Sequence, residues 1–398
     1  MRLSARARAI TPSPTMAIDS KSKQMLAEGI DVVNFSVGEP DFDTPDHIKA
    51  AGIGAINRGE TKYTPAAGTL ELRKAICEKL QKENGLSYKP EQIVVSNGAK
   101  QSLYNAYQVL LDPGEEVILQ APYWVSYPEM IRMAGGVPVV VETDGSNGFK
   151  MTADQIREKL TPRSRAINLN SPSNPTGAVY TRAELQAIAE LAVEKDLIIV
   201  TDEMYEKLLY DGAEHVSIAT LGDEVKKRTI TVNGMSKAYA MTGWRIGYTA
   251  SETIYAKAMA DLQSHSTSGP SSISQKAAVE ALKGSQEPVE AMRAEFDRRR
   301  THMMARLNRL PGFSITVAPQ GAFYLFPDVS GLFGKTVKGR KIANSDDLAE
   351  VILEEAQTAV VPGSGFGSPA YIRFSYATSM ERIDEGINRI ERLLSEVK

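Results

Sequence analysis

The sequence predicts an α/β protein with a mostly parallel, seven-stranded sheet in a large domain and a smaller α+β domain formed by both chain ends. Seven short apolar runs recur between residues 93 and 249, rich in β-branched residues and without polar alternation. Strands buried on both faces of a parallel sheet have this pattern. The runs are residues 93–95, 117–119, 137–141, 166–169, 197–200, 229–232 and 246–248.

Helical patterns lie between several of these runs. After Gly98, apolar residues recur on one helical face as far as residue 111. Thr181 and Glu184 have the spacing of a capping box ahead of a second amphipathic helix. Strands alternating with helices predict the crossover connections of a parallel sheet.

The two ends of the chain have a different pattern. We expect residues 1–45 to form an N-terminal arm and part of the small domain, 46–285 the large domain, and 286–398 the rest of the small domain. Thr378 and Glu381 are predicted to cap the last helix, from residue 380 onward. The other elements expected at these ends are strands at 32–36, 313–317, 321–326 and 371–375 and a charged helix over 290–310.

Composition limits the class of protein. With 42% hydrophobic and 24% charged residues, the chain can bury a large core. A net charge of -3 argues against nucleic acid or an anionic membrane as the main partner, and no apolar run approaches the ~20 residues of a membrane helix. The single cysteine, Cys77, excludes an intrachain disulfide and suits a reducing compartment such as the cytoplasm. Arg2, Arg6 and Arg8 give the N-terminus a faint likeness to a transit peptide, but no cleavage pattern follows and we interpret it as an ordinary arm.

Lys237 and Arg245 are the most informative pair of residues. The predicted strand 229–232 leads into a polar, glycine-bearing loop that carries both side chains. An amine that can form a Schiff base, beside a fixed cation that can hold a phosphate, is what covalent binding of pyridoxal phosphate requires. Taken alone, the same pattern fits a loop with a solvated lysine.

Polar residues follow three other predicted strands, where ligands of parallel sheets bind. Gly98 opens a helix whose N-terminus suits a phosphate, although a plain strand-to-helix turn also fits. Asp202 could ligate a metal, cap a helix or pair with a protonated ring nitrogen. Asn174 lies in a proline-rich turn and is either a ligand-binding or a turn residue.

Other chemistries are poorly supported. The four histidines, at 47, 215, 265 and 302, have no metal-ligand spacing to another histidine or cysteine, so no metal is expected. There is no Gly-x-Ser-x-Gly elbow and no Walker A lysine. Residues 362–367 look like a dinucleotide fingerprint but precede a strand-like segment, so we predict a tight turn.

Taken together and in order, nine segments closely resemble the fold-type I, class I aminotransferases. Within that family they are most similar to the aspartate aminotransferase and aspartate–prephenate aminotransferase subgroup. The segments span nearly the whole chain, and their joint pattern is highly specific. They are residues 36–42, 63–65, 96–100, 121–124, 174–177, 202–205, 236–237, 243–245 and 371–374.

The resemblance implies pyridoxal 5'-phosphate as cofactor. Lys237 would bind it as a Schiff base and then move a proton from the substrate Cα. Asp202 would pair with the protonated ring nitrogen. Tyr205 and Asn174 would hydrogen-bond the ring 3-oxygen, and Trp124 would stack on the ring.

The resemblance also implies which residues bind the cofactor phosphate and which residue contacts the neighbouring subunit. Tyr63 would reach the phosphate of the neighbouring subunit, so a homodimer is expected. The residues expected around the phosphate within the chain are Gly98, Ala99, Lys100, Ser236 and Arg245.

Substrate binding follows from the same resemblance, with two departures. Arg373 would grip the α-carboxylate bidentately, with the Gly38 backbone closing over it and Trp124 and Asn174 beside it. Better-known aspartate aminotransferases have a serine where this chain has Gly234, and their arginine for the distal carboxylate falls near Ser264 here.

Another cation must therefore bind the distal carboxylate of an acidic substrate. Lys100, helped by Thr15, is the candidate, and a lysine here with the arm sequence 12–15 resembles the aspartate–prephenate subgroup. The alternative is a solvated lysine at a helix start.

The predicted function is ping-pong transamination between L-aspartate and 2-oxoglutarate, with prephenate as another acceptor. The alternatives on the same fold are an aromatic aminotransferase, a β-lyase or a cyclopropane-forming synthase. A cofactor-sensing DNA-binding regulator is disfavoured, because only ~40 residues precede the Gly38 motif and the net charge is -3. A nucleotide-binding protein would leave Lys237, Asp202 and Arg373 unexplained.

Overall fold

A computed structural model describes residues 3–4, 7–8, 10–11 and 14–397. The predicted mostly parallel, seven-stranded sheet is confirmed, with strand order β2-β8-β7-β6-β5-β3-β4. Only β8 runs against its neighbours, and the other pairs are parallel. The strands are β2 (Ile93–Ser96), β3 (Glu116–Ala121), β4 (Val137–Glu142), β5 (Ser164–Asn170), β6 (Ile198–Asp202), β7 (Thr229–Gly234) and β8 (Gly247–Ala250).

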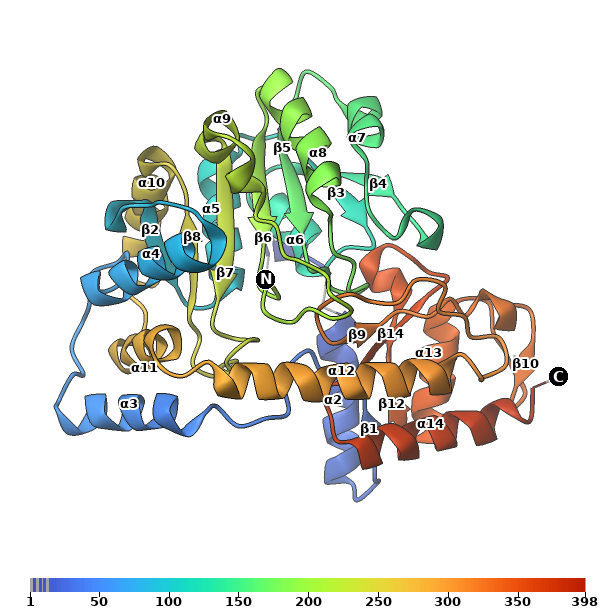
Figure 1. The fold of residues 1–398 in the computed structure, drawn as a ribbon. Helices are drawn as coiled ribbons and strands as arrows, with labels where there is room; N and C mark the ends of the chain where they lie inside the picture. Colours follow the sequence, from blue (N-terminus) through green and yellow to red (C-terminus); the bar gives the residue numbers. More distant parts are fainter. Residues whose placement is uncertain (1–2, 5–6, 9, 12–13, 398) are drawn as a thin grey trace.

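The sheet is covered by helices on both faces (Figure 1). In β3, Val117 and Leu119 pack with Leu103 of α5, whereas Ile118 packs with Ile188 of α8. Consecutive apolar residues are needed because neighbouring side chains of a strand point to opposite, equally buried faces. The helices of this part are α3 (Asp46–Asn57), α4 (Leu70–Asn84), α5 (Ala99–Leu110), α6 (Ser126–Met133), α7 (Ala153–Lys159), α8 (Arg182–Glu194), α9 (Asp223–Lys227), α10 (Thr253–Ser264) and α11 (Ser272–Lys283).

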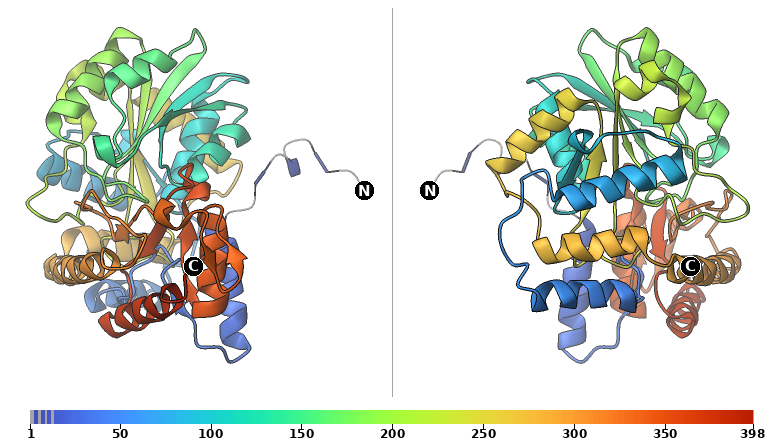
Figure 2. Two further views of the ribbon diagram at one scale, coloured as in Figure 1. Left: turned by 90° about the vertical axis from the view of Figure 1, so that its right-hand side faces the viewer. Right: turned by 60° about the vertical axis from the view of Figure 1, so that its left-hand side comes forward.

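The smaller part of the molecule joins both ends of the chain, as predicted. β1 (Val33–Asn34) pairs in parallel with β12 (Thr358–Ala359), and α2 (Pro14–Ala27) packs beside the same region (Figure 2). The long helix α12 (Glu287–Leu307) runs from beneath the large sheet into this part (Figure 1). Its other elements are β9 (Tyr324–Leu325), β10 (Thr336–Val337), β11 (Arg340–Lys341), β13 (Val361–Pro362), β14 (Ile372–Ser375), α13 (Ser345–Ala356) and α14 (Met380–Leu394).

Short 3-10 turns complete the chain, at Pro90–Gln92, Gly145–Asn147, Ile218–Leu221, Ser330–Leu332 and Gly363–Phe366. The last of them ends at Gly367 in the left-handed conformation, with φ 78°, which confirms the tight turn predicted in place of a dinucleotide site. None of the helices in the described ranges combines the length and apolar character that a bilayer crossing requires.

Three sequence predictions about the C-terminal part were wrong in detail. Residues 313–317 form no strand, because Ser314 exchanges one pair of backbone hydrogen bonds with Asp328 and the nearby Pro319 cannot extend a ladder. The strand expected at 321–326 shrinks to β9, and the charged helix lies three residues earlier than expected, as α12.

The cap of α14 was also predicted one residue too early. Ser379, not Thr378, is the N-cap, and its hydroxyl accepts a hydrogen bond from the Arg382 N–H at 3.3 Å. Thr378 has Glu381 at the capping-box spacing, which is why it was predicted, but the adjacent Ser379 hydroxyl forms the cap. By contrast, the Thr181–Glu184 capping box of α8 is confirmed.

Replacing Ser379 with alanine should lower the free energy of unfolding by about 1 kcal/mol, because one N–H of the first turn of α14 loses its acceptor. Thr378→Ala is the matched control and should cost less than half as much. Denaturant unfolding of the two variants makes the comparison, and equal losses would contradict the assigned cap.

Candidate active site

A cavity of about 540 Å³ lies at the carboxyl ends of the central strands, where the large sheet meets the chain ends. It gathers residues that are far apart in the sequence. The predicted site residues that line it are Gly38, Ala99, Lys100, Trp124, Asn174, Asp202, Tyr205, Ser236, Lys237, Arg245 and Arg373. Gly98 is not in this lining but directly precedes Ala99, which is. Tyr63 does not reach the cavity and is 99% exposed, while the side chain of Thr15 lies outside the described residues.

Asp202 is the last residue of β6 and is buried in the cavity wall. Its carboxylate accepts hydrogen bonds from the Tyr127 hydroxyl at 2.8 Å and from the Met204 N–H at 3.1 Å. Burial raises the pKa of Asp202 to about 6, although the hydrogen bond from Tyr127 opposes this. A cation placed beside this carboxylate would stabilise its charged form, which is what pairing with a protonated ring nitrogen requires.

Lys237 follows β7 and points into the same cavity. Its ammonium donates to the Gly38 carbonyl and lies 5.7 Å from the centre of the Phe323 ring. Desolvation lowers the pKa of Lys237 to about 8, and the positive charges of Arg373 and Arg245 act in the same direction. Lys237 is therefore not a solvated loop lysine, and near neutral pH part of it is the uncharged amine that a nucleophile requires.

The start of α5 lies directly under the Arg245 guanidinium. Gly98 is the N-cap with φ 83°, and a Cβ there would lie 2.2 Å from Arg245 Nη2. The guanidinium is held by the carbonyls of Thr242, at 2.9 Å, and Asn97, at 3.3 Å. A helix N-terminus facing a fixed guanidinium fits a phosphate group.

Arg373 lies on β14 and is 3% exposed. Its Nη1 donates to Asn174 Oδ1 at 3.0 Å, its Nη2 donates to the Ser36 carbonyl at 2.6 Å, and its buried Nε has no hydrogen-bond partner within the described residues. The guanidinium stacks over the Tyr324 ring, 4.5 Å from the ring centre. Because its hydrogen-bond partners are neutral oxygens, this buried cation can still bind a carboxylate.

Aromatic residues complete the walls. The hydroxyls of Tyr205 and Tyr324 are 2.8 Å apart, and Trp124 packs edge-on against Tyr127 with ring centres 5.3 Å apart. The exposed Lys100 places its ammonium 4.8 Å from the centre of the Trp124 ring, at the edge of the cavity. Lys100 is thus within the site, but it is not buried.

Several residues of the site were missed in the sequence. Tyr127 and Tyr324 carry no local signal and reach the site only through the tertiary fold. Asn170 ends β5, accepts from the Asn174 N–H at 2.9 Å and donates to the Asp202 carbonyl at 3.0 Å. The strand-end rule that marked Asp202 would also have found Asn170.

The structure explains one departure from the better-known enzymes. A Cβ at Gly234 would lie 2.7 Å from the Ile246 carbonyl oxygen, so the β7–β8 pairing leaves no room for a serine. Ser264, the position of the missing arginine, ends α10 and does not line the cavity.

Behind the site, Glu203, Glu206 and His215 bring their potential ligand atoms within 4.8 Å of one another. Sequence spacing did not reveal this cluster, because residues 203 and 215 approach through the fold. The Lys79 ammonium already bonds Glu206 and supplies the positive charge that a metal would bring.

Comparison with known proteins identifies the family. The family model "Aminotransferase class I and II" matches residues 30–390, and the chain belongs to this pyridoxal-phosphate-dependent family. An aspartate aminotransferase from Bacillus sp. (strain YM-2) is 51% identical over 98% of this chain and 99% of its own length. An aspartate/prephenate aminotransferase from Cereibacter sphaeroides is 48% identical over 96% of both chains. The crystal structure of the aspartate aminotransferase from Rhizobium meliloti superposes with a TM-score of 0.96, at 44% identity over 100% of both chains.

Removing the Lys237 amine should stabilise the cofactor-free protein in a pH-dependent way. The pKa of Lys237 falls from 10.5 in the unfolded chain to about 8 in the folded protein. Above pH 10.5 the amine is neutral in both states and does not oppose folding. As the pH falls to 8 and below, the amine is charged in the interior as well, and its desolvation lowers the free energy of unfolding. Lys237→Met should therefore unfold at a higher temperature than the wild type at pH 7, by the equivalent of about 2 kcal/mol. The difference should shrink as the pH rises from 8 to 10.

Thermal unfolding of both proteins without cofactor, at pH 7 and pH 10, measures this effect. Lys62→Met, at an exposed position, is the control for loss of a surface lysine. A stabilisation that is the same at both pH values would show that the Lys237 amine is not desolvated in the folded protein.

Proposed function

We propose that this protein is a pyridoxal-phosphate-dependent aminotransferase that moves the amino group of L-aspartate to 2-oxoglutarate in a ping-pong cycle. Prephenate is proposed as a further acceptor. The supporting observation is that one cavity contains the Lys237 amine, whose pKa is lowered, and the Asp202 carboxylate, whose pKa is raised. The guanidiniums of Arg245 and Arg373 line the same cavity. The similarity to an aspartate aminotransferase and to an aspartate/prephenate aminotransferase supports aspartate and prephenate as substrates.

The residues of the site fit the cofactor. Pyridoxal phosphate supplies a carbonyl that reacts with amines and a ring that withdraws electrons from the substrate Cα. Lys237 would bind it covalently through Nζ and, when displaced by the substrate amine, carry the proton from the substrate Cα. Asp202 would hold a proton on the ring nitrogen, Tyr205 and Asn174 would donate to the ring 3-oxygen, and Trp124 would cover the ring face.

The phosphate would lie at the start of α5. Gly98 lies directly under the Arg245 guanidinium, and the Ala99 N–H belongs to the first turn of α5, where N–H groups have no partner within the helix. Ser236 would provide a hydroxyl from the loop that carries Lys237. These groups can neutralise a phosphate without an additional metal ion.

The substrate carboxylates would be read by two cations. Arg373 would bind the α-carboxylate bidentately with the Gly38 backbone beside it. Its hydrogen-bond acceptors are neutral oxygens, and its Nε has no partner in the part of the chain that the structure describes. Lys100, together with Thr15, would bind the distal carboxylate from the cavity edge. This arrangement would favour a dicarboxylate over an amino acid with one carboxylate.

We also propose closure of the chain ends and a homodimer. Residues 1–45 and 286–398 would form the small domain that closes on 46–285 and excludes water from the reacting Cα. The 99% exposure of Tyr63 supports its reach into a neighbouring subunit. An adjacent, largely apolar cavity of about 830 Å³, which shares Lys100 and Arg245 with the site, is the surface on which a second copy would lie. The single cysteine supports a cytoplasmic location.

The absorbance spectrum of the purified protein tests the proposed function. A visible cofactor band should disappear on addition of L-aspartate alone and return on addition of 2-oxoglutarate, because the amine is stored on the protein between the two half-reactions. Lys237→Ala should show neither the band of the wild type nor turnover. A band that aspartate leaves unchanged would refute the substrate, and no band after reconstitution would refute the enzyme. Release of pyruvate and ammonia would identify a β-lyase instead.

The role of Lys100 makes a selective prediction. Lys100→Ala should lower kcat/KM for aspartate by about 100-fold or more and for an aromatic amino acid by less than about threefold, because only aspartate has the distal carboxylate. Steady-state kinetics with both donors gives the ratio. Equal losses on the two donors would assign Lys100 to the cofactor phosphate or to the solvent, not to specificity.

A further inference from the structure

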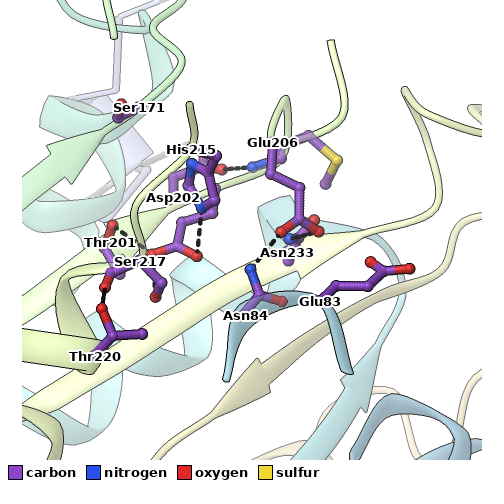
Figure 3. Close-up of polar contacts among 12 residues, drawn as sticks. Glu83, Asn84, Ser171, Thr201, Asp202, Glu206, His215, Ser217, Thr220 and Asn233 are labelled. Atoms are coloured by element: carbon purple, nitrogen blue, oxygen red, sulfur yellow. Dashed lines mark hydrogen bonds and ion pairs between the residues drawn. The ribbon is translucent and has the colours of Figure 1, made fainter. Parts of the chain in front are cut away.

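A buried polar network lies directly behind the cavity and joins the two segments that carry the proposed cofactor-binding residues (Figure 3). At its centre is the Glu206 carboxylate. Its Oε1 accepts from the Lys79 ammonium and from Asn233 Nδ2 at 2.8 Å, and its Oε2 accepts from Asn84 Nδ2 at 2.9 Å. Lys79 also donates to Asn84 Oδ1 at 2.8 Å. We refer to Lys79, Asn84, Glu206 and Asn233 as the Glu206 network.

The network contains a fully ionised, buried pair. The side chains of Lys79 and Glu206 are 3% and 9% exposed. Although burial opposes ionisation, the Lys79 charge lowers the pKa of Glu206 to about 2, and the Glu206 charge likewise keeps the pKa of Lys79 raised. Desolvation cancels most of the attraction in such pairs, and apolar replacements of similar size are often as stable. Stability alone therefore gives no reason for these residues.

The position of Glu206 in the chain gives a reason for these residues that stability does not. Glu206 directly follows Tyr205 and comes four residues after Asp202, on the loop after β6. Asn233 lies near the end of β7, four residues before Lys237, and its Oδ1 accepts from the Gly234 N–H at 2.7 Å.

The backbone ladder between these segments ends early. The last paired residues of β6 and β7 are Asp202 and Val232, followed by one hydrogen bond from the Glu203 N–H to the Val232 carbonyl. Beyond that point the Glu206–Asn233 hydrogen bond links side chains of the two segments. In Figure 3, Glu206 and Asn84 meet Asn233 at this place, to one side of Asp202.

We infer that Glu206 is a positioning residue that, through Asn233, sets the separation between the Asp202–Tyr205 loop and the Ser236–Lys237 loop. The inference rests on the proposed function, since these loops would hold different parts of the cofactor: one loop the ring nitrogen and 3-oxygen, the other the reactive carbon and the phosphate. Lys79 and Asn84 hold the Glu206 carboxylate in the orientation that this bond needs. Small errors in such a separation weaken binding and chemistry strongly.

Two double variants distinguish the positioning role of Glu206 from any effect of the buried Lys79–Glu206 charges. In Lys79→Met/Glu206→Gln both charges are absent, yet the glutamine carbonyl can still accept from Asn233. Its amide can donate to Asn84 Oδ1 once the Asn84 amide, freed from Lys79, turns over. In Lys79→Met/Glu206→Leu the volume is similar, but no acceptor faces Asn233. Neither variant leaves an unpaired charge in the interior, so both are expected to fold.

Three measurements compare these variants with the wild type: thermal unfolding of the cofactor-free protein, the pyridoxal phosphate dissociation constant, and the pH midpoint of the visible band. The leucine variant should bind the cofactor at least about tenfold more weakly and titrate at a higher pH, because Tyr205 and Asp202 hold the ring less well. The glutamine variant should remain within about threefold of the wild type. Similar dissociation constants and midpoints for the two variants would overturn the inference.

Asn233→Ser tests the same link from the other side. It keeps the Lys79–Glu206 pair and should reproduce the weaker binding and the shifted midpoint of the leucine variant. Wild-type values for Asn233→Ser would overturn the inference even if the leucine variant did not fold. A wild-type protein without any cofactor band would instead refute the proposed function.

Discussion

The parallel register of β5, β6 and β7 is the constraint on which the site depends. Asn170 pairs with Asp202 in one ladder and Asp202 with Val232 in the next, so the three strands end at the same edge of the sheet. The residues that directly follow these strands therefore lie close together at this edge of the sheet. The carboxylate, the asparagine turn and the lysine loop meet for this reason, although more than 60 residues separate Asn174 from Lys237.

The second half of the cavity depends on the joining of the chain ends. Arg373 reaches the site from β14, and its guanidinium is held by Ser36, a residue 337 positions earlier. The parallel pairing of β1 with β12 places the N-terminal segment where this contact forms. Among the described residues this buried guanidinium has no carboxylate partner, which costs folding free energy, and its contacts with the Tyr324 and Phe366 rings offset part of that cost.

Much of the fold could be predicted from local patterns. The strands of the large sheet carry short apolar runs because helices cover the two faces of the sheet, and such runs can be recognised without long-range information. The same reasoning failed for residues 313–317 and for the cap of α14, where a single bridge or a choice between adjacent hydroxyls decides the outcome. Strand-end residues such as Asp202 were found by rule, and others such as Arg373 by resemblance. Tyr127 and the Glu206 network could not be found, because their roles exist only after helices distant in sequence have packed.

The reversed strand β8 has an evolutionary consequence. Because β8 runs antiparallel to β7, the segment between them leaves the sheet and returns to it at the same edge. Lys237 and Arg245 therefore belong to one closed loop whose two ends are fixed in the sheet, at Gly234 and Gly247. Inserting or deleting a residue there would displace both side chains together, so this loop can diversify by substitution but hardly by change of length, unlike most loops at a protein surface.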